Sequence, residues 1–285
     1  MPYTQEISRQ NKALFLFLLD QSYSMEDAIG NSPNKKKDEL VTAINGWLQN
    51  MTIRSTGGEG IRDYVDIGVI GYRTDADANP IIESPLGGAL TGREMVSIVD
   101  IGNNPARLET KTKQFFDEDL GELVETQVEV PVWVEPKAEG GTPMCNALYR
   151  AYELVDKWIQ EHPRSFPPVV IHISDGESQD GDPLPYAEPL RGLATEDGNV
   201  LLFNCHLSET PGDPFLFPAS GEILPNDLAR VLFKMSSELP EKMYQSAVAE
   251  GFELQPGARG MAYNADMVSL IKFLDMGTRQ ARTLR

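Results

Sequence analysis

Three oxygen-bearing side chains alternate directly after a run of large apolar residues near the start of the sequence. The stretch LFLFLLDQSYSM, residues 14–25, places Asp20, Ser22 and Ser24 at every second position. If the chain stays extended there, alternate side chains point to the same side. One carboxylate and two hydroxyl groups would then converge, and such groups are hard oxygen donors that suit a small divalent cation.

Two later segments offer further groups of the same kind. In the segment GGTP, residues 140–143, Thr142 comes immediately before a predicted helix, and Pro143 suits the first helical position. The segment ISDG, residues 173–176, ends another apolar run with Asp175. The candidate set therefore contains two carboxylates and three hydroxyls: Asp20, Ser22, Ser24, Thr142 and Asp175.

This donor set predicts a cation of the Mg²⁺ type rather than zinc, because the sequence shows no cluster of His and Cys residues. Two carboxylates at most balance the charge of a divalent ion, and the hydroxyls are neutral. A metal held in this way stays electrophilic and keeps a position for exchangeable water. A carboxylate from a partner could take that position, so the pattern predicts a binding site.

The elements that must position these groups alternate between buried strands and amphipathic helices. The apolar patterns predict strands over residues 13–20, 65–75, 169–175 and 199–207, and helices over residues 36–51, 143–162 and part of 183–198. This alternation predicts the α/β class, with a Rossmann-like, mostly parallel central sheet and helices on both faces. Ligands of such sheets bind beyond the carboxyl ends of the strands, where Asp20 and Asp175 lie.

Two regions fit this pattern less well. Residues 83–135 carry short strand signals around a charged middle, and we expect an edge strand plus an elaborated hairpin or loop insertion. Residues 211–285 contain helix-like segments with enough apolar residues to pack back on the sheet, so we expect a C-terminal helical extension. We predict one domain over residues 1–285, with its core over about residues 10–210.

Together the three segments resemble the metal-ion-dependent adhesion site (MIDAS) of von Willebrand factor A (VWA) domains. DQSYS at residues 20–24 resembles the DxSxS signature of that family, GGT at 140–142 its second element, and SDG at 174–176 its third. The order of the three elements also matches, and the resemblance covers roughly residues 10–210. A lone DxSxS would be weak, because aspartate and serine are common; three elements at strand and helix boundaries are more specific.

The resemblance implies a VWA fold and a bound Mg²⁺, with Mn²⁺ or Ca²⁺ as alternatives. It implies that Ser22, Ser24 and Thr142 are ligands, and that Asp20 and Asp175 act directly or through water. Domains of this family usually bind proteins through an acidic side chain of the partner, so we expect a non-enzymatic, metal-dependent binding module. Among its members, we expect similarity to the bacterial intracellular proteins, including the tellurite-resistance-associated group.

The net charge and the two cysteines restrict the possible binding partners and the cellular compartment of the protein. The formal net charge of −18 argues against binding to nucleic acid or to an anionic membrane, because phosphates would be repelled. Cys145 and Cys205 lie in apolar contexts and are expected to be buried free thiols, which fits a reducing compartment. The N-terminal residues lack a signal-peptide pattern, and apolar runs of bilayer length are absent. We therefore expect a cytoplasmic protein.

The same residues also allow other interpretations. Ser22 and Ser24 could be turn or helix-capping residues. A phosphatase of the haloacid dehalogenase type needs a second Asp two residues after the first, and here that position is Ser22. The nucleotide-binding glycine motifs and the serine-hydrolase elbow are also absent from the sequence. A metal-dependent phosphohydrolase that uses Asp20 remains the alternative.

For residues outside the three motifs we expect mainly structural roles. The lysine run at residues 35–37 is expected to be a solvated helix face, and His172 a hydrogen-bonded core residue. His206 is expected to be structural, although it could reach the binding edge, and Trp133 is expected to pack in the hairpin. Tyr23 could face either solvent or the next helix.

Overall fold

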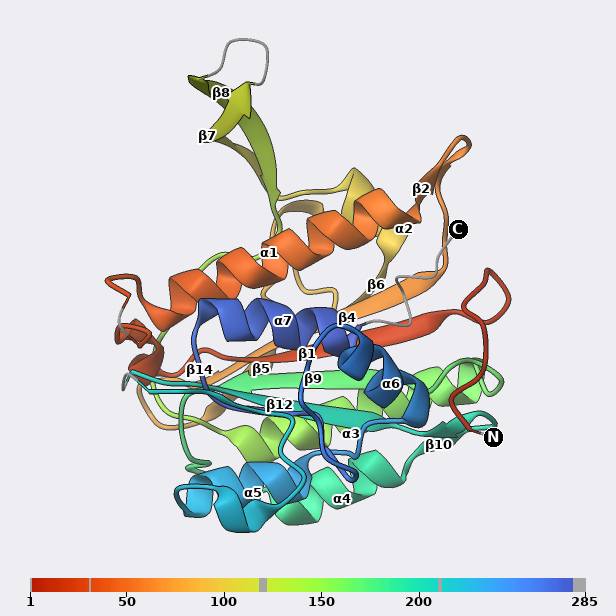
Figure 1. Ribbon diagram of the computed structural model, residues 1–285, viewed down its shortest axis with the longest axis vertical. Coiled ribbons are helices and arrows are strands. Elements are labelled where there is room, and N and C mark those ends of the chain that lie inside the picture. The colour runs from red at the N-terminus through yellow and green to blue at the C-terminus, as the bar shows by residue number, and fades with distance from the viewer. Residues whose placement is uncertain (1, 31, 118–121, 210–211, 279–285) are drawn as a thin grey trace.

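The computed structural model of the chain describes residues 2–30, 32–117, 122–209 and 212–278. A central sheet with the strand order β13-β14-β12-β9-β1-β4-β5, to which β6 adds through β4, lies between two layers of helices (Figure 1). The five strands from β14 to β4 run parallel, and β5, β6 and β13 pair antiparallel with their neighbours. The predicted α/β class with a mostly parallel sheet is confirmed. The strands of this sheet are β1 (Ala13–Asp20), β4 (Val65–Thr74), β5 (Pro80–Glu83), β6 (Met95–Ser97), β9 (Val169–Ser174), β12 (Leu201–Leu207), β13 (Phe215–Leu216) and β14 (Met261–Ala265).

The strand β1 is apolar throughout because both faces of the sheet are covered there. All eight of its residues are buried, and alternate side chains enter two different cores. Phe15 and Phe17 pack with one set of helices, and Leu16 and Leu18 with the other. The first set is α1 (Lys36–Ser55), α2 (Ile98–Asn103), α6 (Glu241–Ala249) and α7 (Met267–Gly277); the second is α3 (Met144–Glu161), α4 (Leu184–Gly192) and α5 (Asp227–Met235).

Every long element expected from the sequence is present within a few residues of its predicted ends. Helix α1 continues to Ser55, beyond the predicted end at residue 51. Pro143 does not occupy the first position of α3 but the position before it. Helix α4 contains Pro189 in its interior.

The segment from residue 83 to 135 differs from its strand-like pattern in one place. Only Met95–Ser97 of the apolar stretch MVSIVDIG is a strand, and α2 follows at once. Ser97 caps this helix by accepting a hydrogen bond from the backbone N–H of Asp100 at 3.1 Å. The rest of the segment forms the long hairpin of β7 (Arg107–Asp117) and β8 (Glu122–Val132), which projects from the body in Figure 1. Residues 118–121 of the expected insertion lie outside the described residues.

The C-terminal region adds more than helices to the fold. Besides α5, α6 and α7 it supplies β14, which pairs in parallel with β12 and extends the sheet. Residues 211 and 279–285 of the expected extension lie outside the described residues. The remaining short elements are β2 (Thr56–Gly57), β3 (Gly60–Ile61), β10 (Ala194–Thr195), β11 (Gly198–Asn199) and the 3-10 turns η1 (Tyr23–Glu26), η2 (Gly88–Leu90) and η3 (Gly221–Ile223).

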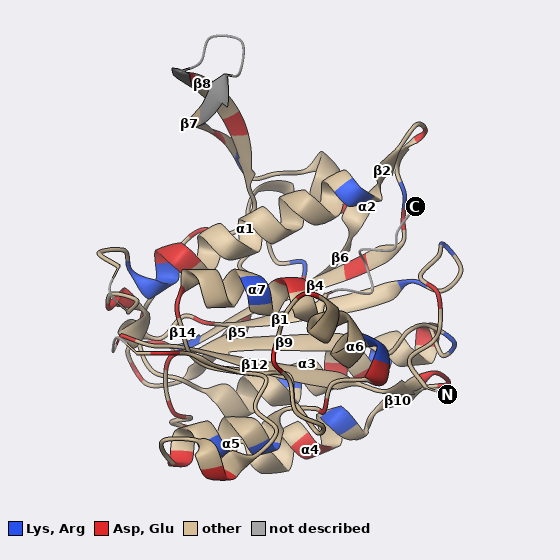
Figure 2. Ribbon diagram, in the orientation of Figure 1, with Lys and Arg blue, Asp and Glu red and all other residues tan. Residues whose placement is uncertain are grey.

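Most charged residues lie on the outside of this architecture, and Asp20, Lys36 and Arg73 are buried exceptions. Figure 2 shows Asp and Glu on both helical layers and on the hairpin, with Lys and acidic residues side by side at the start of α1. Among the described helices, none is both long and apolar enough to cross a bilayer.

Candidate metal-binding site

The two acidic residues of the candidate set, Asp20 and Asp175, lie at the carboxyl ends of neighbouring strands. Strands β1 and β9 pair in parallel with Leu19 opposite Ile173, so Asp20 ends one strand beside Ser174, which ends the other. The Ser174 hydroxyl donates a hydrogen bond to Asp20 Oδ2 at 2.6 Å. The next residue, Asp175, therefore leaves the sheet directly beside Asp20.

The two serines continue this arrangement along the edge of the sheet. The backbone N–H of Ser22 donates to Asp20 Oδ1 at 2.8 Å, which turns the chain into η1. Ser22 Oγ and Ser24 Oγ are 3.1 Å apart, and Ser24 Oγ donates to Asp175 Oδ1 at 2.8 Å. Four of the five candidate residues thus form one hydrogen-bonded chain.

The spacing of these oxygens fits a small octahedral cation. Ligands at about 2.0–2.1 Å from Mg²⁺ lie roughly 2.9 Å from their neighbours in an octahedron. The two hydroxyl separations, from Ser22 to Ser24 and from Ser24 to the Asp175 carboxylate, are 3.1 and 2.8 Å. Only modest shifts would therefore be needed to replace the present hydrogen bonds with bonds to one ion. The donor chemistry also fits, because the side chains of all four residues offer oxygen atoms.

Backbone hydrogen bonds of Gly140 and Thr142, rather than the Thr142 hydroxyl, place Thr142 beside the four hydrogen-bonded residues. The backbone N–H of Tyr23 donates to Gly140 O at 2.9 Å, which holds the glycine segment against η1. The backbone of Thr142 binds Gln179, whose side-chain oxygen accepts from Thr142 N at 3.2 Å. Thr142 itself is buried. Its role as a ligand stays a prediction.

The first glycine of this segment is required by its conformation. Gly140 has φ +61°, and a Cβ placed there would lie deep inside contact distance of the Thr74 carbonyl oxygen. Only glycine adopts this backbone without strain. The glycine pair therefore lets the chain pass close to the end of β4 and deliver Thr142 to the start of α3.

The acidic groups of the site are removed from water. The Asp175 side chain is 0% exposed, and Asp20 is 1% exposed. Burial, together with the nearby charge of Asp175, raises the pKa of Asp20 to about 6. A cation at this position would offset both effects, since it favours the ionised carboxylate.

The structure also places a lysine in this site, which the sequence interpretation missed. Lys36 is 3% exposed, and its Nζ donates to Asp175 Oδ2 at 2.6 Å. The expectation that residues 35–37 form a solvated face is therefore wrong for Lys36. A signal was present: Lys36 lies four residues before Leu40 and eight before Ile44, on the apolar face of α1.

The structure shows which way two side chains near the site face, Tyr23 and His206. Tyr23 is 69% exposed although it lies between the buried Ser22 and Ser24, so it faces solvent rather than the next helix. His206 is buried and stacks on Tyr263 with ring centroids 4.4 Å apart, and burial lowers its pKa to about 4. Its Nδ1 is a buried atom without a hydrogen-bond partner among the described residues.

Three further residues, two of them with expectations from the sequence, have structural roles. His172 is fully buried and hydrogen-bonded to Tyr72 and Asn204, which confirms it as a core residue. Trp133 is buried at the base of the hairpin, where its indole N–H donates to Ile101 O at 2.8 Å. Asp180, one of the acids after the third motif, caps α3 through the backbone N–H groups of Cys145 and Asn146.

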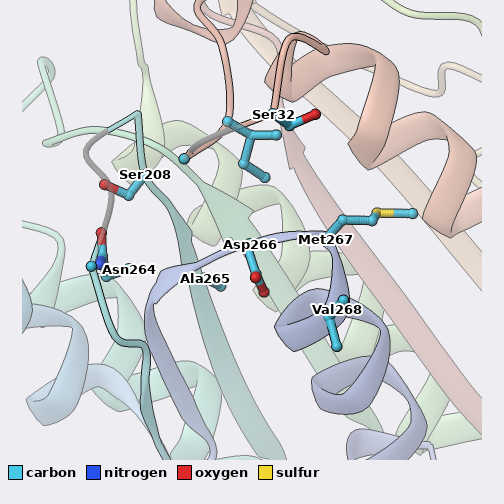
Figure 3. Close-up of a pocket in the computed structure, with 10 residues that line it drawn as sticks. Ser32, Ser208, Asn264, Ala265, Asp266, Met267 and Val268 are labelled. Atoms are coloured by element: carbon cyan, nitrogen blue, oxygen red, sulfur yellow. The ribbon is translucent and has the colours of Figure 1, made fainter.

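A cavity of about 210 Å³ opens at the same end of the sheet. It lies beyond β12 and β14, because Ser208 follows the first of these strands and Asp266 the second. Figure 3 shows Ser32, Ser208 and Asn264 among the side chains that line it. None of the five candidate ligands lines this cavity, which lies beside the candidate site at the same end of the sheet.

Comparisons with known proteins give no family assignment. Family models do not match the chain, and curated proteins do not match its sequence. Among the described residues there is also no group of three or more His, Cys, Asp or Glu side chains arranged to hold a metal. The candidate site depends instead on two carboxylates and on hydroxyl groups.

Solved structures give distant similarities. The chain is similar to the vWF domain of Mfa5, a type V pilus tip protein of Porphyromonas gingivalis, at 12% identity and a TM-score of 0.31, over 59% of this chain and 39% of that one. A three-domain N-terminal structure of Mfa5 matches at 13% identity and a TM-score of 0.29, over 59% and 20%. The PilB minor pilin of Streptococcus sanguinis matches at 9% identity and a TM-score of 0.46, over 99% and 64%.

The chain spans less than two thirds of the length of each of these structures.

Proposed function

We propose that this chain is a VWA-type module that binds a partner protein through a divalent metal ion, with Mg²⁺ as the preferred ion. The observation that carries the proposal is the hydrogen-bonded chain from Asp20 through Ser22 and Ser24 to Asp175. These hydrogen-bonded residues gather oxygen donors at the carboxyl edge of a parallel sheet, where ligands of such sheets bind.

Each residue of the set has a defined part in this proposal. Asp20 and Asp175 supply the negative charge, while Ser22, Ser24 and Thr142 supply neutral oxygens. The bound ion would act as a Lewis acid that accepts one carboxylate oxygen from the partner. Ser174 positions Asp20 through their 2.6 Å hydrogen bond and so keeps its second oxygen directed toward the serines.

We propose binding rather than catalysis because the second Asp that a phosphatase of the haloacid dehalogenase type needs is absent two residues after Asp20. The position two residues after Asp20 holds Ser22, whose hydroxyl lies 3.1 Å from Ser24 Oγ. The two buried histidines, His172 and His206, have pKa values lowered to about 4 by burial, so they stay neutral near pH 7.

We also propose that the protein is cytoplasmic, because Cys145 and Cys205 are both buried and free, which fits a reducing compartment.

The proposal is tested by metal binding and by partner capture on the same variants. We expect Mg²⁺ to bind the purified chain with a stoichiometry of one in isothermal titration calorimetry and to raise its melting temperature. Asp20→Asn and Ser24→Ala should each remove most of this binding. Asp77→Asn is the matched control, because it removes an equal charge from an exposed loop.

Partner capture then distinguishes the functional alternatives. Immobilised wild-type chain should retain a specific protein in Mg²⁺ and release it in EDTA, and Asp20→Asn should retain little. Capture that is unaffected by EDTA would contradict a metal bridge. Hydrolysis of a phosphate ester by wild type, lost in Asp20→Asn, would instead favour the phosphohydrolase alternative.

A further inference from the structure

Lys36 is an unusual residue for the site just described, because it is a buried cation among oxygen donors. Its Nζ lies 2.6 Å from Asp175 Oδ2 and 3.3 Å from Ser24 O. The Lys36 side chain is 3% exposed and that of Asp175 is 0% exposed. Buried charges are retained when they are paired, so this ion pair is part of the folded structure.

The neighbouring lysines differ in both partner and exposure. Lys35 and Lys37 pair with Glu26 outside the site, and their side chains are 50% and 20% exposed. The three consecutive lysines therefore divide into one that reaches the candidate metal site and two that do not. This division supplies matched controls with the same residue type.

The second acidic neighbour of Lys36 lies in a different environment. Asp27 Oδ2 is 3.9 Å from Lys36 Nζ, and the Asp27 side chain is 53% exposed. Lys36 thus lies between a buried carboxylate inside the site and a half-exposed carboxylate at its edge. A small movement of the ammonium toward Asp27 would free Asp175.

We propose that Lys36 is a built-in competitor of the metal ion for Asp175. Without metal, its ammonium neutralises Asp175; when the metal binds, the ammonium leaves Asp175 and pairs with Asp27. This inference rests on the proposed metal site and adds the residue that sets its affinity. A positive charge at hydrogen-bond distance from a ligand repels a divalent ion and must be moved away before the ion binds, so wild-type affinity is lower than the oxygen donors alone would give.

The pairing is tested first without metal. In EDTA, Lys36→Met should lower the melting temperature by several degrees, because it leaves Asp175 buried and unpaired. In an Asp175→Asn background the same substitution should have little effect. Lys35→Met and Lys37→Met are the controls and should leave the melting temperature nearly unchanged. Equal effects of Lys36→Met in both backgrounds would overturn the pairing.

The competition is tested by Mg²⁺ titration in a calorimeter. Lys36→Met should bind Mg²⁺ at least about tenfold more tightly than wild type, and Lys37→Met should bind as wild type does. Asp27→Asn should bind Mg²⁺ several-fold more weakly, because it removes the alternative acceptor of the ammonium. Asp77→Asn controls for the same change in net charge. Asp27→Asn keeps the test decisive if Lys36→Met does not fold.

The outcomes separate this inference from the proposed function. Wild type and Lys36→Met binding Mg²⁺ equally would overturn the competition and leave the metal site standing. If wild type and every variant fail to bind Mg²⁺, the proposed function itself fails, while the melting experiments in EDTA still decide the Lys36–Asp175 pairing. Tight binding by Lys36→Met and weak binding by wild type supports both.

Discussion

At the scale of single residues, the most exposed group of the candidate site is an aromatic side chain. Tyr23 is 69% exposed, while its backbone N–H holds the glycine segment through Gly140 O. Its side chain can therefore be removed without disturbing the neighbouring serines. Tyrosine is enriched among residues that dominate the energy of protein interfaces.

We predict that Tyr23→Ala weakens binding of the captured partner by about tenfold or more and leaves Mg²⁺ affinity unchanged. Surface plasmon resonance with the partner measures the first effect, and calorimetry measures the second. Tyr149→Ala is the control, since Tyr149 is a similarly exposed tyrosine, 54% exposed, on helix α3. Equal losses of partner affinity in both variants would show that Tyr23 does not contact the partner more strongly than Tyr149 does.

A second residue-scale prediction concerns the hydroxyl of Thr142. The hydrogen bonds that place Thr142 use its backbone and Gln179, so changing its side chain keeps the segment in position. We predict that Thr142→Val lowers Mg²⁺ affinity by about tenfold, whereas Thr142→Ser retains it. The measurement is calorimetric titration of both variants. Wild-type affinity in Thr142→Val would remove Thr142 from the ligand set.

The residues of the site differ in how far the sequence alone could predict them. Asp20, Ser22 and Ser24 could be placed together because extended backbone alternates its side chains, and Asp175 because parallel strands share an edge. Lys36 could not be recognised in a run of three lysines without giving weight to helical periodicity. Its contact with Asp175 also depends on how α1 packs on the sheet, which local spacing does not determine.

At the scale of elements, two glycines have opposite roles. Gly140 has φ +61° and packs against the end of β4, whereas Gly46 lies inside α1 with open space where a Cβ would stand. Gly140→Ala should destabilise the fold by about 2–4 kcal/mol through strain and overpacking. Gly46→Ala should stabilise it by about 0.5–1 kcal/mol, because alanine favours helix.

Urea unfolding of both variants measures these effects. The Gly140→Ala variant should also bind Mg²⁺ more weakly, because the strained segment delivers Thr142. Gly46→Ala should bind Mg²⁺ as wild type does. A neutral effect of Gly140→Ala on stability would mean that the segment can move away from Thr74 at little cost.

Long elements were predictable and short ones were not, for a physical reason. Strand β1 and helix α3 have enough residues for a clear apolar pattern. Helix α2 has six residues, and its identity depends on the Ser97 cap rather than on its apolar content. Strand β14 has five residues and is defined by pairing with β12, a long-range contact that no local pattern records.

At the scale of the whole molecule, the projecting hairpin is separate from the two cores. Trp133 and Val134, which follow β8, belong to one core, and Asn45 Oδ1 accepts hydrogen bonds from both of their backbone N–H groups. We predict that replacing residues 109–130 with an Asn-Gly turn leaves the melting temperature within a few degrees of wild type and Mg²⁺ affinity unchanged. Differential scanning fluorimetry and calorimetry check this. Loss of folding would show that the hairpin stabilises the body.

A buried chain of hydrogen bonds crosses the sheet and fixes the state of one histidine. Tyr72 Oη and His172 Nε2 are 2.7 Å apart, and His172 Nδ1 and Asn204 Oδ1 are 3.0 Å apart. Asn204 donates its amide N–H to Ser236 Oγ, so its oxygen accepts from His172. The tyrosine hydroxyl then donates to Nε2. Both imidazole nitrogens are satisfied in the neutral form, with Nδ1 as donor and Nε2 as acceptor.

This arrangement predicts a pH dependence of stability. Burial lowers the pKa of His172 from 6.5 to about 4. Between these values the unfolded chain binds a proton that the folded chain does not, so the contribution of His172 is present above pH 6.5 and is lost as the pH falls toward 4. The full loss is up to about 3 kcal/mol. Asp20, with its raised pKa, acts in the opposite direction in metal-free protein.

Comparing wild type with His172→Gln isolates the histidine, because Asp20 is common to both proteins and cancels. We predict that the variant is less stable at pH 7.5, since two buried hydrogen bonds are disturbed, by about 1–3 kcal/mol. The difference should shrink as the pH falls from 6.5 to 4.5, because only wild type loses the histidine contribution. Urea unfolding in EDTA across this range measures the difference. A constant difference would mean that His172 accepts a proton in the folded state, and that the hydrogen-bonded chain does not fix its charge.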